Sequence, residues 1–387
     1  MSATAAQGFV AAGIACGIKK SGDPDLALVA TDDGRPVVAA AVFTTNRATA
    51  APVQTSRRHL AATTGRAAAV VLNSGNANAA TGQGGQRVAD KTCELVAQAL
   101  ACTADEVLIC STGLIGIPLA LEPFLTGVPA LVAARSRDGG AAAARAIMTT
   151  DTHAKQVVVE ADGFVIGGMA KGAAMLAPNM ATMLAVLTTD AAVPVSVLKG
   201  ALADAAAGSF NEMTVDGACS TNDTVIVLAS GRRGPVDPAR FAEALARACG
   251  DLSVQMAADA EGATKLVRIR VVGARSDTQA ALAARKVAES QLVKCSLFGA
   301  DPYWGRIVSE CGSSGADFDL DSTQVAYGGV VVCRGGEPCT HDAAAVATHM
   351  AGREITVSID LGLGTGQAAI VTADLTPAYI AENMRTS

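Results

Sequence analysis

The sequence predicts a protein of the α/β or α+β class, because apolar runs typical of strands alternate along the chain with apolar residues at helical spacing. Half of the 387 residues are hydrophobic but only 3% are aromatic, so Ala, Val, Leu and Ile supply most of the apolar mass. There are also 39 glycines. A chain of this length can bury a large core, and this composition suits closely packed sheets and helices with tight turns.

The first half of the chain predicts two hairpins. Apolar runs at 26–31 and 37–43 flank Asp32-Asp33-Gly34-Arg35, and Asp-Gly between two such runs is a hairpin signal. A second hairpin is expected over 157–166, with its turn at 161–163. Further strands are expected at 67–72 and 107–110, and helices at 86–100, 119–135 and 141–148.

The second half continues the alternation. Strands are expected at 183–187, 225–230, 265–272 and 324–333, helices at 195–207 and 279–290, and one long or two short helices at 238–258. The chain has no internal repeat, low-complexity linker or long charge run, so composition does not mark a domain boundary.

Charge and composition exclude several classes of function. The net charge is −6 with no basic patch, which argues against a nucleic-acid partner. Residues 1–9 lack the basic start and apolar run of a signal peptide, and no apolar stretch reaches the length of a membrane span. A cytoplasmic protein with reduced thiols is therefore expected. The ten cysteines form no C-x-x-C pair and the four histidines do not cluster near them, so a zinc site is not expected.

The most informative segment is 171–184, KGAAMLAPNMATML. A loop containing Gly and Pro leads directly into an apolar strand that begins with Thr182. Taken alone, such a junction is more often an ordinary loop-to-strand connection than a catalytic site, since Thr is a good strand residue.

The segment resembles the self-cleavage motif of the ornithine acetyltransferase family, also called bifunctional glutamate N-acetyltransferase of arginine biosynthesis. The resemblance covers essentially the whole chain, with the matching segments in order. Besides 171–184, they are Gly8-Phe9, Gly13, 17–20, 42–46, 73–79, 111–116, 148–152, 215–217, 220–224, 261–265, 292–294, 299–302 and 304–306.

This resemblance implies a four-layer αββα core with N-terminal-nucleophile-like chemistry, plus a smaller C-terminal α/β region. It also implies cleavage between Ala181 and Thr182, giving an α chain of residues 1–181 and a β chain of 182–387. These would be cleavage products rather than folding domains, and the expected assembly is an α2β2 heterotetramer.

The implied chemistry suits the residues. A threonine hydroxyl needs a base to become a nucleophile, and an N-terminal threonine carries one in its own α-amino group, with a pKa of about 7.7–8.0. Cleavage would begin with attack of the Thr182 hydroxyl on the Ala181 carbonyl. The freed Thr182 would then take the acetyl group of N-acetylornithine and pass it to glutamate, in a ping-pong scheme through an acetyl-threonine ester.

The resemblance assigns the remaining site residues. Thr112 and Gly113 match the oxyanion-hole pair, which stabilises the tetrahedral intermediate. The substrate contacts map onto Thr149, Thr150, Lys171, Thr182, Glu261, Asn383 and Ser387. Lys171 suits a carboxylate, and Glu261 suits an ammonium group or a proton transfer. Which of Thr149, Thr150 and Thr152 touches substrate is left open, and the spacing of Asn383 to Ser387 is one residue shorter than usual in the family.

Three departures from the family pattern, Ala174, Ala218 and Tyr303, put substrate choice in question more than reaction class. No metal or organic cofactor is implied, and acetyl-CoA remains open as a second acetyl donor. Two other readings stay open: a related N-terminal-threonine amidohydrolase or aminopeptidase, and an uncleaved, inactive homologue. A dinucleotide-binding enzyme is rejected, because the glycines at 362, 364 and 366 fail the required spacing.

Overall fold

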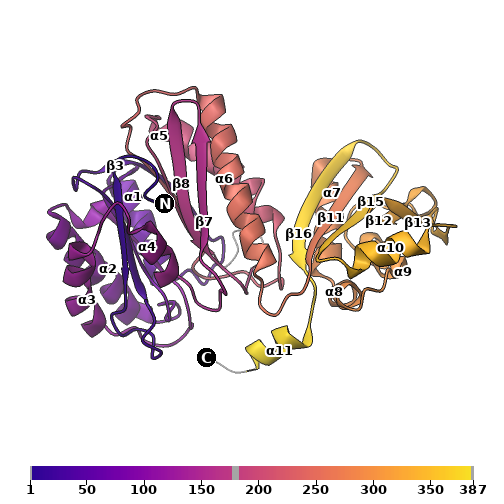
Figure 1. Ribbon diagram of the computed structural model, residues 1–387, viewed down its shortest axis with the longest axis horizontal. Coiled ribbons are helices and arrows are strands. Elements are labelled where there is room, and N and C mark those ends of the chain that lie inside the picture. The colour runs from indigo at the N-terminus through magenta and orange to yellow at the C-terminus, as the bar shows by residue number, and fades with distance from the viewer. Residues whose placement is uncertain (1, 177–182, 385–387) are drawn as a thin grey trace. The chain divides into compact units, whose positions relative to one another are not determined.

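The computed structural model describes residues 2–176 and 183–384, which form two compact units (Figure 1). The first unit contains the described residues of 1–211 and 218–256, and the second those of 212–217 and 257–386. The expected smaller C-terminal region is confirmed. The cleavage point between Ala181 and Thr182 lies outside the described residues, so the division into α and β chains stays a prediction.

Two sheets form the centre of the first unit. One has four strands in the order β1-β2-β5-β6, and the other has six in the order β4-β3-β10-β9-β8-β7. The pairs β5–β6 and β9–β10 are parallel, and the other neighbours are antiparallel. The strands are β1 (Phe9–Ile14), β2 (Leu26–Thr31), β3 (Val37–Phe43), β4 (Arg66–Ala67), β5 (Ala69–Asn73), β6 (Val107–Ser111), β7 (Lys155–Ala161), β8 (Phe164–Lys171), β9 (Leu184–Thr189) and β10 (Thr224–Ala229).

Helices cover the outer faces of both sheets. Helices α2 and α3 share a buried cluster with the four-stranded sheet, while α5 packs on β3 and β10, and Phe241 of α6 lies against Phe164 of β8. The helices are α1 (Ala51–Ala62), α2 (Gly82–Leu100), α3 (Glu122–Ala133), α4 (Gly140–Ala146), α5 (Val195–Ala207) and α6 (Pro238–Ala258), with short 3-10 turns at Ala104–Glu106 and Phe210–Glu212.

The two sheets pack face to face through small side chains. Their shared cluster contains Val29 and Leu72 from the four-stranded sheet and Val186 and Ile226 from the six-stranded sheet, together with many alanines. Helix, sheet, sheet and helix therefore follow one another, and the four-layer αββα core is confirmed. Alanine brings the backbones of packed layers close together, which explains why so few aromatic residues suffice for this core.

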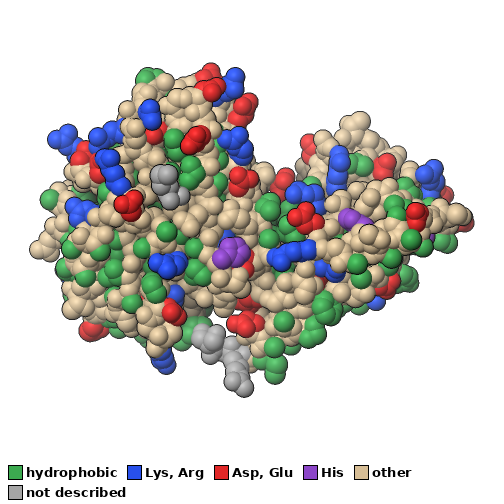
Figure 2. Space-filling model, in the orientation of Figure 1, with side chains coloured by type: hydrophobic (Ala, Val, Ile, Leu, Met, Phe, Trp, Pro, Cys, Tyr) green, Lys and Arg blue, Asp and Glu red, His purple; other side chains and the backbone are tan. Residues whose placement is uncertain are grey.

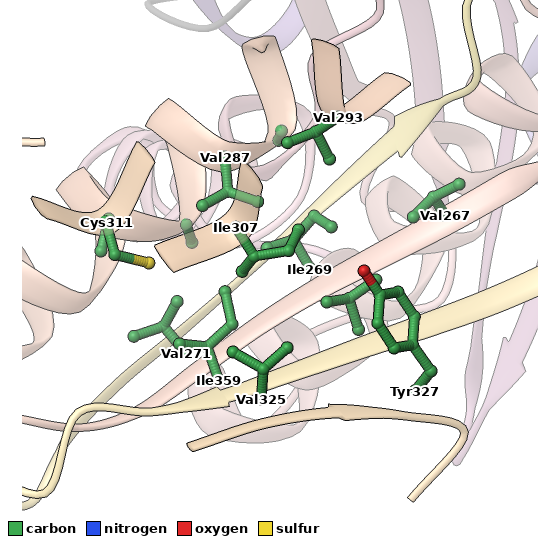
Figure 3. Packing of buried hydrophobic residues seen from close by; sticks show 14 of the residues in the cluster. Val267, Ile269, Val271, Val287, Val293, Ile307, Cys311, Val325, Tyr327 and Ile359 are labelled. Atoms are coloured by element: carbon green, nitrogen blue, oxygen red, sulfur yellow. The ribbon is translucent and has the colours of Figure 1, made fainter. Parts of the chain in front are cut away.

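The second unit is built on another six-stranded sheet, ordered β14-β13-β12-β15-β11-β16. Figure 3 shows Ile269 and Val271 of one strand close to Val287 and Ile307 of two helices, and all four side chains are buried. The elements are β11 (Leu266–Ala274), β12 (Gln324–Tyr327), β13 (Val330–Arg334), β14 (Glu337–Pro338), β15 (Glu354–Asp360), β16 (Gly366–Ala373), α7 (Asp277–Glu289), α8 (Gln291–Phe298), α9 (Trp304–Gly312), α10 (Ala343–Ala351) and α11 (Pro377–Asn383), with a 3-10 turn at Leu320–Ser322.

Two strand predictions were wrong in their connections. The predicted hairpin of 26–31 with 37–43 does not form: β2 pairs with β1 and β5, whereas β3 pairs with β10 and β4. Strand β2 is fully buried and already has a partner on each side, so it has no edge left for β3. The Asp-Gly turn therefore carries the chain to the other sheet. The single strand expected at 324–333 is a hairpin, β12–β13, which turns at Gly328-Gly329 with both residues at positive φ. The hairpin predicted over 157–166 is confirmed by β7 and β8.

The distribution of charged side chains on the surface agrees with the charge pattern of the sequence, and the free cysteines agree with the reduced thiols that were expected. Figure 2 shows basic and acidic side chains interspersed over the visible face, without a large patch of one sign. All ten cysteines are free, as expected. Among the described residues, no helix is both long and apolar enough to cross a membrane. Within the same residues, no cluster of three or more His, Cys, Asp or Glu side chains could hold a metal ion.

The close approach of α4 to β1 gives a test of this packing. A Cβ placed on Gly139 would lie 1.8 Å from the carbonyl oxygen of Ala11, whereas one on Gly200 of α5 would meet nothing within 4 Å. We expect Gly139→Ala to lower the free energy of unfolding by about 1–3 kcal/mol through overpacking. Gly200→Ala, the matched control, should raise it by about 0.5–1 kcal/mol. Equal denaturation midpoints for Gly139→Ala and wild type would contradict this packing.

Candidate functional site

Thr112 lies where two parallel strands end together. Strands β5 and β6 are parallel, so the loops that follow them meet at one edge of the four-stranded sheet. The backbone N–H of Thr112 donates to the carbonyl oxygen of Asn73 at 2.9 Å. The Ser111 hydroxyl also donates to the Asn73 side-chain oxygen, at 2.6 Å. The backbone N–H of Thr112 is therefore engaged within the protein and is not available to a ligand.

Gly113 occupies a position that only glycine fits. Its φ is +130°, and a Cβ there would lie 2.4 Å from the carbonyl carbon of Gly75 and 2.5 Å from the Asn76 nitrogen. The Gly113 N–H has no hydrogen-bond acceptor among the described residues. An unengaged N–H beside a threonine hydroxyl is the arrangement that an oxyanion hole requires.

Lys171 meets Thr112 from the other sheet. It is the last residue of β8 and only 3% exposed, and its Nζ donates to the Thr112 Oγ1 at 3.2 Å. An ammonium group has donors only, so the Thr112 oxygen must accept. The single hydroxyl proton of Thr112 is then directed elsewhere. The structure thus brings two of the predicted site residues into contact, and it shows which of them donates.

Asp151 lies at the centre of this cluster, and the sequence analysis gave it no role. Its side chain is fully buried, and its Oδ1 accepts from Lys155 Nζ at 2.5 Å and from the Gly172 N–H at 2.7 Å. Its Oδ2 accepts from the Thr149 N–H at 2.9 Å. Burial alone would raise the pKa of Asp151, but Lys171 and then Lys155 lower it to about 2.

The same contacts distinguish the candidate threonines. Thr149 is half-buried, and its backbone N–H binds the carboxylate that also holds Gly172, next to Lys171. Thr150 and Thr152 are exposed. The structure therefore brings Thr149 into one hydrogen-bonded group with the end of β8.

The segment before β10 supplies two further polar groups. The Asn222 amide donates to the carbonyl oxygens of Ala77 at 2.6 Å and Ser111 at 2.9 Å, so it fastens both loops of the four-stranded sheet to the six-stranded sheet. Asp223 Oδ1 accepts the N–H of Met183 at 2.9 Å. Asp223 Oδ2 has no hydrogen-bond partner among the described residues.

Burial raises the pKa of the Asp223 carboxyl well above its ordinary value, although the Met183 N–H, the Ser220 hydroxyl and Lys171 each lower it. This carboxyl binds the backbone N–H of Met183, which is the residue that follows the predicted nucleophile Thr182 in the chain. Thr182 and Ala181 themselves lie outside the described residues.

The second unit brings together the other two described candidates. Asn383, at the end of α11, donates through Nδ2 to Glu261 Oε2 at 2.7 Å. Gly262 makes this approach possible, because it has a φ of +63° and a Cβ there would lie 2.4 Å from the Tyr379 nitrogen. The structure thus places Glu261 and Asn383 next to each other, while their contact with substrate stays a prediction. Ser387 lies outside the described residues.

The three departures from the family pattern occupy different environments. Ala174 is half-buried in the turns after β8, Ala218 is exposed, and Tyr303 is 54% exposed just before α9. None of them replaces a residue of the Thr112 cluster, and their effect on substrate choice stays a prediction.

The ionised state of Asp151 gives a pH-dependent prediction. Its folded-state pKa, about 2, is below the ordinary value of 3.8, so its stabilisation is present above about pH 4 and lost as the pH falls toward 2. The size is on the order of 2 kcal/mol. Asp151→Asn should therefore be less stable than wild type at pH 7, with a gap that narrows between pH 4 and 2.5 in denaturant titrations. Asp162→Asn, whose side chain is 93% exposed, is the control and should stay near wild type throughout. A gap for Asp151→Asn that is constant with pH would contradict the assignment.

Comparison with known proteins places the chain among its relatives. A family model described as the ArgJ family matches residues 10–386. The "arginine biosynthesis bifunctional protein ArgJ" of Thermobifida fusca is 48% identical, over 99% of this chain and 99% of its own. The protein of that name from Mycobacterium tuberculosis is 47% identical, with coverages of 98% and 95%.

Two solved structures are also similar. ArgJ from Bacillus halodurans is 36% identical, covers 51% of this chain and 95% of its own, and has a TM-score of 0.49. An ornithine acetyltransferase from Mycobacterium tuberculosis, complexed with ornithine, is 45% identical, with coverages of 46% and 94% and a TM-score of 0.41. Since the family model spans nearly the whole chain and relatives of full length share 47–48% of its residues, the chain belongs to the ArgJ family, as its motifs predicted, and is an acyltransferase of arginine biosynthesis.

Proposed function

We propose that this protein cuts itself between Ala181 and Thr182 and then uses Thr182 to move the acetyl group of N-acetylornithine to glutamate. The observation that carries the proposal is the pairing of the Thr112 hydroxyl with the unengaged Gly113 N–H. Lys171 occupies the acceptor side of that hydroxyl at 3.2 Å, so both groups are ready to donate to an oxyanion. Such a pair serves acyl transfer in general, and the family membership directs it to an acetyl group.

The reaction proceeds in two half-reactions. The Thr182 hydroxyl gives its proton to the α-amine and attacks the acetyl carbonyl, and collapse of the tetrahedral intermediate releases ornithine. The glutamate amine then attacks the acetyl-Thr182 ester and restores the free hydroxyl. Both tetrahedral intermediates carry their negative charge on the former carbonyl oxygen, where Thr112 and Gly113 donate.

Self-cleavage uses the same nucleophile. The Thr182 hydroxyl attacks the Ala181 carbonyl, the peptide nitrogen leaves as the new α-amine, and water hydrolyses the resulting ester. The products are an α chain of 1–181 and a β chain of 182–387, which assemble as α2β2. The proposed compartment is the cytoplasm.

Substrate recognition uses charge pairing. The buried Lys171 ammonium suits an α-carboxylate, and Glu261 suits the ammonium of the ornithine side chain. Asn383 lies 2.7 Å from the Glu261 carboxylate and can orient it, while Thr149 and Ser387 are further proposed contacts. The reaction requires no metal or organic cofactor, and acetyl-CoA is a second donor to be tested.

Intact-mass spectrometry tests the self-cleavage. We expect purified wild type to give two fragments, one ending at Ala181 and one beginning at Thr182. Thr182→Ala should give a single uncut chain, because it has no hydroxyl to attack the Ala181 carbonyl. An uncut wild-type chain would remove the α-amine that the mechanism needs and would identify the protein as an uncleaved homologue.

The oxyanion hole is tested with Thr112→Ala, which removes one donor. In an assay of acetyl transfer from N-acetylornithine to glutamate, kcat should fall by about 10²–10³-fold with little change in KM. Thr112→Ser, which keeps the hydroxyl, is the matched control and should retain most of the activity. Acetate release faster than glutamate acetylation in wild type would identify an amidohydrolase instead, and the same assay with acetyl-CoA decides whether it serves as a donor.

A further inference from the structure

The buried Asp151 carboxylate joins three segments of the first unit. It accepts hydrogen bonds from Lys155 of β7, from the N–H of Gly172 just after β8, and from the N–H of Thr149 after α4. The side chains of Asp151 and Lys155 are both 0% exposed. A buried carboxylate is retained at a cost of desolvation, so this complete set of donors suggests a task beyond filling space.

The Asp151 carboxylate lies next to the end of β8, which carries the predicted site residue Lys171. Gly172 follows Lys171 directly, so the hydrogen bond from Gly172 fixes the backbone from which the Lys171 side chain extends. Lys171 is only 3% exposed, and its positive charge is close enough to Asp151 to lower the pKa of that carboxyl. A lysine that is charged and held in place donates to Thr112 Oγ1 at 3.2 Å.

That contact decides where the Thr112 proton can go. The hydroxyl has one proton and two lone pairs, and one lone pair faces the Lys171 ammonium. A neutral or displaced Lys171 would release this constraint, and the hydroxyl could then turn its proton toward a protein acceptor. A preorganised donor saves the reorganisation that would otherwise add to the barrier.

We propose that Asp151 is a positioning residue of the acyl-transfer reaction, which acts through Lys171 to keep the Thr112 hydroxyl aimed at the oxyanion. The inference rests on the proposed function, in which Thr112 and Gly113 bind that oxyanion. Asp151 itself touches neither substrate nor the reacting atoms.

A double-mutant cycle in the acetyl-transfer assay tests this relay, by which we mean the action of Asp151 on Thr112 through Lys171. Asp151→Asn alone should lower kcat by about 10²-fold, close to the loss of a single oxyanion donor. In the Thr112→Ala background, the same change should lower kcat by less than about threefold, since the group that it positions is already gone. Full multiplication of the two losses would show that Asp151 acts by a merely structural route and would overturn the proposal.

Lys155→Met is the matched control, because it breaks the same buried ion pair but leaves the hydrogen bond of Asp151 to Gly172 and its charge opposite Lys171. The factor by which Lys155→Met lowers kcat should be the same in wild type and in the Thr112→Ala background, so the two losses should multiply. If Asp151→Asn does not fold, Asp151→Glu keeps the charge but shifts the carboxylate by one methylene, and the cycle is repeated with it. Coupling to Thr112 is expected there too, and its absence counts against the relay.

A crystal structure of Asp151→Asn separates this inference from the proposed function. Lys171 Nζ should move beyond hydrogen-bonding distance of Thr112 Oγ1. Retention of that contact would overturn the relay whether or not the protein transfers acetyl groups. Conversely, a wild-type protein without acetyl transfer, in which the contact is present and is lost in Asp151→Asn, would overturn the proposed function and leave the positioning of Lys171 supported.

Discussion

A carboxylate sealed from water must be met by cations and amide donors, and at Asp151 these come from three separate stretches of chain. Lys155 begins β7, Gly172 follows β8, and Thr149 precedes Asp151 in the connection from α4. This one anion therefore ties both strands of a hairpin to the loop beside them. The orientation of Lys171, and through it the direction of the Thr112 hydroxyl, follows from that tie.

Local patterns predicted many elements of the fold, but they missed others, among them β1, α1, β15 and β16, and they did not give every strand its partner. Helix α5 begins and ends at the residues that periodicity indicated, 238–258 forms one helix rather than two, and the hairpin at 157–166 formed as expected. The link at 32–35 has the chemistry of a hairpin turn, yet it joins strands of different sheets. Turn residues fix how the chain bends, whereas pairing depends on which other strands compete for the same edge, and β2 is taken by β1 and β5 on both sides.

The candidate site could also be predicted only in part from the sequence. Family motifs pointed to Thr112, Gly113 and Lys171, and the structure adds that Lys171 donates to the Thr112 hydroxyl. Asp151 and Asn222 lie inside motifs that were recognised, but an Asp or an Asn among threonines is usually a turn residue or a solvated one. Their importance comes from burial and from partners far away in the chain, and neither property is visible in a single sequence. The contact of Glu261 with Asn383 is equally non-local, because the two are 122 positions apart.

The order of strands in the six-stranded sheet has a consequence for the proposed self-cleavage. Strands β3, β4, β7 and β8 precede the proposed scissile bond in sequence, while β9 and β10 follow it. In space the order is β4-β3-β10-β9-β8-β7, so the later pair is inserted between the two earlier ones. The strands of the two proposed pieces therefore alternate in blocks within one sheet. Separation would break the ladders on both sides of the inserted pair and expose the wholly buried strand β9. The proposed cut would therefore free an amine without separating the two pieces, because the hydrogen-bonded ladders of the sheet would still hold them together.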